Sequence, residues 1–182
     1  GQGFEFFRKY YPNKLYDYIL FEPNPNCFQI LNKKYSKLAS NGVRLENVAV
    51  GVENTYVDFY GLEDEKGGPY SVGGTVLPEH NSKNYAAPDH ASLQVESIDF
   101  AAFVLDIIQN KNYAFVILKL DIEGGEYPWL LNLDESKLKK FKQIVIEFHG
   151  ITDNGWNTIY NDKIRLYTND DLYNKYIAEL YN

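Results

Sequence analysis

Three runs of apolar residues along the chain have the length of β-strands. They are residues 17–21 (DYILF), 114–120 (AFVILKL) and 143–148 (QIVIEF). Strands of a parallel sheet that is covered on both faces are apolar throughout, without alternation. We therefore predict a buried strand at each of these runs.

Three other segments indicate strands of a different kind. Residues 43–50 (VRLENVAV) are rich in valine, and residues 163–168 (KIRLYT) form a weaker candidate. In residues 52–60 the apolar Val57 and Phe59 alternate with Tyr56, Asp58 and Tyr60. That alternation predicts a strand with one buried face.

Helices are predicted between these strands. Residues 26–40 carry apolar side chains at the helical period, and Asn24 or Asn26 can cap the first turn. We also expect a short helix over residues 3–11, after a glycine turn at the start of the chain. Three further helices are expected over residues 98–108, 130–141 and 170–181.

Strands that alternate with helices form βαβ units, so the predicted fold class is α/β with a mostly parallel sheet. In such sheets ligands bind at the C-terminal ends of the strands, near the point where strand order reverses. Residues 61–93 are rich in Gly, Pro, Ser, Asn and His, and a loop of that length is usually functional or mobile.

An acidic residue, Glu22, follows the first apolar strand. In dinucleotide-binding folds an acid at this place accepts hydrogen bonds from ribose hydroxyls, about 20 residues beyond a glycine turn. Gly1-Gln2-Gly3 is such a turn at about that separation. Glu22 can equally be a charge at the start of a helix, which the helix dipole favours.

Charged residues are densest after the strand 114–120, in KLDIEGGE. Side chains alternate along a strand, so Lys119 and Asp121 share a side, with Glu123 beyond them. The other interpretation is a structural ion pair followed by a helix start, with Glu126 as a first-turn acid. Because three acids and a lysine beside a buried strand are costly without a purpose, we favour a functional site.

His149 follows the strand 143–148, and Glu147 lies inside that strand. A histidine can act as a general base near neutral pH. A single histidine can equally be a hydrogen-bonded polar group, and both interpretations stay open. His80 and His90 lie in the long loop and are expected to be surface residues.

Composition excludes several classes of protein. The 182 residues carry a net charge of -7, without the basic face typical of nucleic-acid binding. The single cysteine, Cys27, allows neither an internal disulfide nor a cysteine-based zinc site, so a cytoplasmic location is expected. No apolar run reaches the ~20 residues of a membrane span, and no signal peptide is apparent.

Together, the strand-end motifs resemble the FkbM family of methyltransferases. The similarity runs through FEPNP (residues 21–25), ENVAVG (46–51), KLDIEGGEYPWL (119–130) and IVIEFH (144–149), in the family's order and approximate spacing. It covers the chain to about residue 150. The K-x-D-x-E-G-x-E element is its most specific part.

The resemblance implies a Rossmann-like fold of the class I methyltransferase type that uses S-adenosylmethionine. Glu22 would hold the cofactor ribose, and Asp121 would sit beside the reacting sulfonium and the substrate. The other cofactor-binding residues would be Gly1 and Gly3 of the glycine motif and, near the adenine, Asn47, Val48 and Ala49. Family members methylate hydroxyl groups, often on sugars or secondary metabolites. The partners expected are therefore a small-molecule or carbohydrate acceptor and a glycosyltransferase, either fused to this domain or cooperating with it.

The chain departs from the family's pattern at both ends. The first strand and the acidic start of the glycine motif are absent, and the last two strands are hard to find. The sequence contains no methionine, even at position 1. We expect residues 1–182 to form one methyltransferase domain that is incomplete at its N-terminus.

The expected reaction is direct methyl transfer to a substrate hydroxyl, largely by positioning. Asp121 or His149 would be the base, Lys119 and Glu123 would orient the site, and loop 61–93 would close over the acceptor. No metal is expected, although Asp121, Glu123 and Glu147 could instead bind a divalent cation. The rival functions are a non-catalytic methyltransferase-like binding domain and a nicotinamide-dependent dehydrogenase, which has no need of the KLDIEGGE cluster.

Overall fold

The computed structural model describes residues 2–61, 74–77, 93–111, 113–126, 129–130, 136 and 140–146. Within them the chain alternates between strands and helices. The elements are α1 (Gln2–Tyr10), β1 (Tyr18–Phe21), α2 (Pro25–Tyr35), the 3-10 helix η1 (Ser36–Asn41), β2 (Val43–Glu46), β3 (Ala49–Gly51), β4 (Thr55–Phe59), β5 (Leu93–Asp99), α3 (Phe100–Asn110), β6 (Val116–Leu120) and β7 (Phe141–Ile146).

Most of the strand pairs are parallel, as the sequence predicts. β1 pairs with β2, β6 with β7 and β3 with β5 in parallel, while β4 pairs with β5 antiparallel. Among the described residues these pairs form three separate hydrogen-bonded sheets. The α/β class is therefore confirmed, and the arrangement is compatible with a methyltransferase fold.

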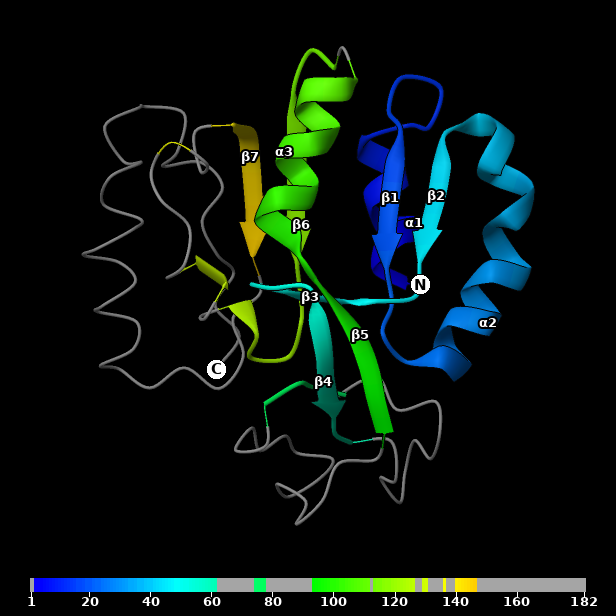
Figure 1. Ribbon diagram of the computed structural model, residues 1–182. Coiled ribbons are helices and arrows are strands. Elements are labelled where there is room, and N and C mark those ends of the chain that lie inside the picture. The colour runs from blue at the N-terminus through cyan, green and yellow to red at the C-terminus, as the bar shows by residue number, and fades with distance from the viewer. Residues whose placement is uncertain are drawn as a thin grey trace, which may run out of the picture.

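The two parallel strand pairs outside the small sheet, β1 with β2 and β6 with β7, deliver their C-terminal ends to one side of the molecule. Figure 1 shows β1, β2 and β7 pointing the same way, toward the end where β3, β4 and β5 lie. The small sheet β3-β5-β4 therefore stands where ligands bind in parallel α/β proteins.

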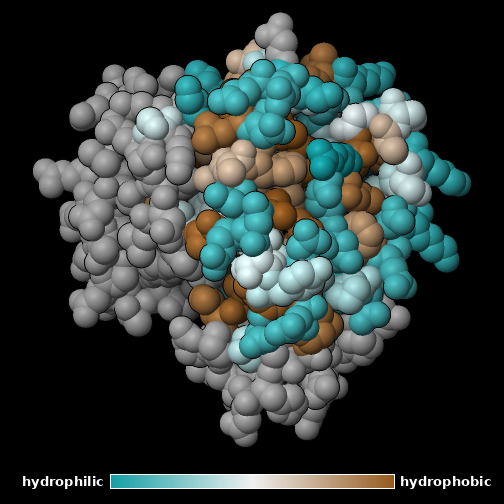
Figure 2. Space-filling model, viewed as in Figure 1, coloured by the Kyte–Doolittle hydropathy of each residue, from teal (hydrophilic) through white to brown (hydrophobic). Residues whose placement is uncertain are grey.

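The largest part of the core joins α3 to β6 and β7. Its buried members are Phe100, Val104, Leu118, Leu120, Trp129, Leu130 and Phe141. Phe21 at the end of β1 packs edge-to-face on Phe100 and Phe103, with ring centroids 5.2 and 5.4 Å apart. Figure 2 shows apolar residues gathered along α3 among hydrophilic ones on this face.

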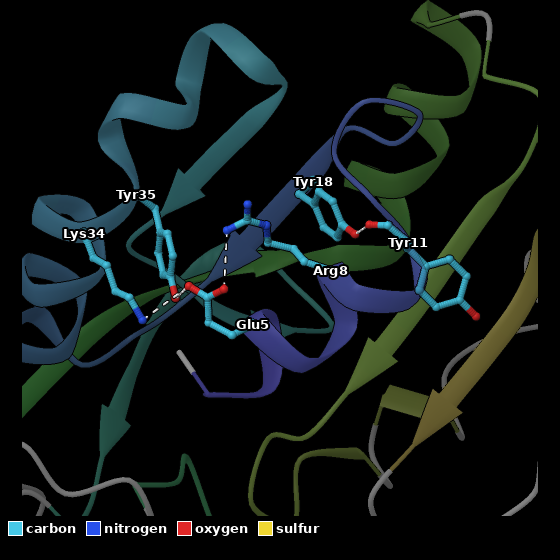
Figure 3. A network of polar contacts seen from close by, with 6 residues as sticks. All are labelled: Glu5, Arg8, Tyr11, Tyr18, Lys34 and Tyr35. Atoms are coloured by element: carbon cyan, nitrogen blue, oxygen red, sulfur yellow. Dashed lines mark hydrogen bonds and ion pairs between the residues drawn. The ribbon is translucent and has the colours of Figure 1, made fainter.

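A second cluster fixes α1 against α2 and β2. Phe4, Tyr35 and Val43 are buried together, and Figure 3 shows Glu5 of α1 turned toward Tyr35 and Lys34 of α2. The Tyr35 hydroxyl donates to Glu5 at 2.8 Å, and Lys34 pairs with the same carboxylate at 3.4 Å. The Tyr35 hydrogen bond is the main reason that the pKa of Glu5 lies below its ordinary value.

The structure corrects four of the predicted boundaries. The strand 43–50 is two strands in different sheets, because the chain turns away from β1 after Glu46. Helix 98–108 starts at Phe100, since Asp99 caps it by accepting from the Ala102 N–H at 2.9 Å. Phe141, placed at the end of a helix, opens β7. Gly3 lies inside α1 and not in a turn.

One strand was not predicted at all. β5 alternates between the inward Val95 and Ser97 and the outward Gln94 and Glu96. The polar Ser97 on the inner face hides this alternation in the sequence.

Two predicted elements, 163–168 and 170–181, lie outside the described residues, as does most of loop 61–93. No helix in the part of the chain that the structure describes is long and apolar enough to cross a membrane.

Candidate active site

The segment after β1 is held in place by its own asparagines. Asn24, which is 1% exposed, caps α2 by accepting from the N–H groups of Asn26 and Cys27 at 2.9 and 3.3 Å. The Asn47 amide, which follows β2, donates to the Glu22 and Pro23 carbonyls at 2.7 and 3.2 Å. These bonds fix the FEPNP turn and with it the position of Glu22.

Glu22 lies partly buried at the end of β1. Burial raises the pKa of this carboxyl, and the hydrogen bond from the Asn24 N–H, 3.0 Å long, opposes the rise. A carboxylate has about four acceptor positions, so one backbone donor leaves Glu22 able to accept from a ligand. A hydroxyl that donates here would favour the charged form, which burial penalises.

Lys119 and Asp121 meet at the end of β6. The Lys119 ammonium donates to Asp121 at 2.8 Å, which confirms that the two side chains share a side. The two side chains are 31% and 43% exposed, so the pair adds little to folding stability. Its consequence is geometric, because the lysine fixes the orientation of the Asp121 carboxylate.

The turn after Asp121 is built around Glu126, which is fully buried. Its carboxylate accepts from the Ile122 N–H at 2.7 Å and from the Gly124 N–H at 2.9 Å. This lets Glu123 and Gly124 adopt positive φ angles of 51° and 97°. The sequence interpretation treated Glu126 only as a first-turn acid and missed that it accepts hydrogen bonds from the turn before it. The adjacent Gly124 and Gly125 were the sequence feature that indicates a tight turn here.

Thr75 also belongs to the site, although it comes from the long loop. It is 1% exposed, and its hydroxyl donates to the Glu123 carbonyl at 2.6 Å and accepts from the Leu77 N–H at 3.1 Å. Backbone bonds of 2.8 and 3.2 Å tie it to Tyr60 at the end of β4. Nothing in the sequence sets Thr75 apart from the other polar loop residues.

Glu22 and Asp121 each directly follow a residue of the largest core cluster or one that packs on it. Phe21, directly before Glu22, packs against the cluster that contains Leu120, and Ile122 packs on it too. Asp121 stands between these last two residues. The ends of β1 and β6 therefore pack on one core cluster, and a ligand site shared by the two acids stays a prediction.

The remaining candidates have varied surroundings. The Asn47 side chain is engaged by the FEPNP turn, Ala49 is buried in the small sheet's core and Val48 lies between them. Gly3 is exposed on α1. Several candidates lie outside the described residues, namely Gly1, His80, His90, Glu147 and His149. Among the described residues no three metal-ligating side chains come together.

Fold and site thus define an α/β protein that carries one carboxylate directly after β1 and another directly after β6. The chain matches the sequence model of the methyltransferase FkbM domain over residues 2–176, nearly its whole length. It belongs to this family and is a methyltransferase. No curated protein and no solved structure matches the chain.

Proposed function

We propose that the protein is an S-adenosylmethionine-dependent O-methyltransferase that acts on a hydroxyl group of a small molecule. The observation that carries this is the placement of Glu22 and Asp121. One is a partly buried acceptor and the other an ion-paired carboxylate, and each directly follows a strand whose last residue belongs to or packs on the same core cluster.

The residues fit the cofactor. Nucleoside riboses are held in α/β sheets by an acid at the end of a strand, and Glu22 has that position and spare acceptor capacity. When bound, S-adenosylmethionine supplies a methyl group on a positively charged sulfur. Asp121, at the end of β6, would offer the negative charge that such a centre attracts.

Asp121 is the base that we assign to the reaction. It takes the proton of the acceptor hydroxyl as the new C–O bond forms and the S–C bond breaks. The electron pair of the broken bond stays on sulfur, which becomes neutral. Lys119 holds the carboxylate toward the acceptor, and the Glu126 and Thr75 bonds keep the turn behind it rigid. Alignment of this kind supplies a large share of the rate.

Calorimetric titration with S-adenosylmethionine tests the cofactor part of the proposal. We expect Glu22→Gln to weaken binding by about 10- to 100-fold, because hydrogen bonds to a charged group contribute roughly 1.5–3 kcal/mol. Glu96→Gln, an exposed acid on β5, is the control and should bind as the wild type does. A wild-type chain without heat of binding, or equal affinity in both variants, would contradict the proposal.

A further inference from the structure

A pocket of about 140 Å³ lies between the small sheet and the turn that follows β6. Five of its lining residues are apolar, two are glycines, two carry a hydroxyl group and one is acidic. The lining residues are Val50, Val52, Val57, Val76, Trp129, Gly51, Gly125, Thr55, Ser97 and Glu53. We call this the valine pocket.

The valine pocket adjoins the candidate active site. Gly125 belongs to the turn that starts at Asp121, and its N–H donates to the Ile122 carbonyl at 3.3 Å. Val76 follows Thr75, whose hydroxyl is bonded to the Glu123 carbonyl. Two walls of the pocket, Gly125 and Val76, are therefore tied to the turn that follows Asp121.

The size of the pocket suits one ring. Its volume is close to the ~150 Å³ of an apolar cavity that holds benzene. Val52 is 43% exposed, so the pocket reaches the surface beside it and a ligand could enter without unfolding the site.

The lining also selects the kind of ring. A sugar ring would lose the hydration of several hydroxyls against valine side chains, and each unpaired polar group costs free energy. An apolar ring has no hydroxyl hydration to lose, and burial of its surface makes its binding free energy more favourable. Trp129 adds a large aromatic side chain to these apolar walls.

We infer that the valine pocket receives an apolar, ring-sized part of the acceptor, so that the acceptor is an aromatic or alicyclic alcohol and not a bare sugar. The inference rests on the proposed function, because it takes the hydroxyl of the same molecule to face Asp121. It narrows the acceptor class beyond what the family implies.

The test uses para-fluorobenzyl alcohol as the probe, observed by fluorine NMR with the full chain. We expect line broadening with the wild type and a loss of affinity of at least about tenfold in Val57→Phe, which fills the pocket. Tyr56→Phe places the same new side chain on the opposite, exposed face of β4 and should leave binding unchanged. Methyl β-galactopyranoside should not displace the probe.

Each variant is also titrated with S-adenosylmethionine and checked by circular dichroism. If Val57→Phe does not fold, Val57→Leu takes its place, with an expected loss of roughly threefold. The inference is overturned if the wild type binds the cofactor but not the probe. It is also overturned if Val57→Phe binds the probe as tightly as the wild type does. If the wild type does not bind S-adenosylmethionine, the proposed function is overturned. Probe binding to the valine pocket can still be measured in that case.

Discussion

Replacing Asp121 by Asn should lower the rate of methyl transfer by about 10²- to 10⁴-fold, the usual contribution of a general base. The amide has nearly the shape of the carboxylate but cannot take the proton of the acceptor hydroxyl. Transfer of a radiolabelled methyl group to the acceptor that the wild type methylates best measures this loss at saturating cofactor.

Asp106→Asn is the matched control, because it makes the same change at an exposed acid on α3. It should retain the wild-type rate. Full activity in Asp121→Asn would refute the role of Asp121 and leave His149 as the candidate base, to be tested by His149→Ala.

The second large effect is expected on folding stability. Glu126→Ala should lower the free energy of unfolding by about 3 kcal/mol, since it leaves the Ile122 and Gly124 N–H groups without their acceptor inside the protein. Glu126→Gln should cost less, because the amide oxygen can still accept one of the two bonds. Urea unfolding followed by circular dichroism measures both.

Glu96→Gln serves as the control here as well, with an expected change within about 0.5 kcal/mol. If Glu126→Ala were as stable as this control, the buried carboxylate would not be what holds the turn after β6.

The parts of the fold that could be predicted are those whose signal is local. β1, β6 and β7 are continuous apolar runs, and the pairing of Lys119 with Asp121 follows from the two-residue period of a strand. The sequence offered Asn24 or Asn26 as the N-cap of α2, and in the structure Asn24 is the N-cap.

The missed features depend on partners far away in the sequence. Thr75 enters the site through the Glu123 carbonyl, 48 positions along the chain. The break between β2 and β3 accompanies the bonds of Asn47 to a turn about 25 positions earlier. β5 is recognisable only once its neighbours β3 and β4 are in place, since its inner face carries Ser97.

The packing of the end of β1 on the core of α3 and β6 is of the same kind. Each acid follows an apolar strand, so each could be proposed as a ligand-binding residue from its position alone. The meeting of their two strand ends at one cluster depends on Phe21 packing on the core of α3 and β6, which no local pattern encodes.

A crystal structure of the chain with S-adenosylhomocysteine would test the central claim most directly. The account predicts the ribose hydroxyls within hydrogen-bonding distance of the Glu22 carboxylate and the sulfur on the side of Asp121. A nucleoside bound elsewhere, with neither carboxylate in contact with it, would contradict the account.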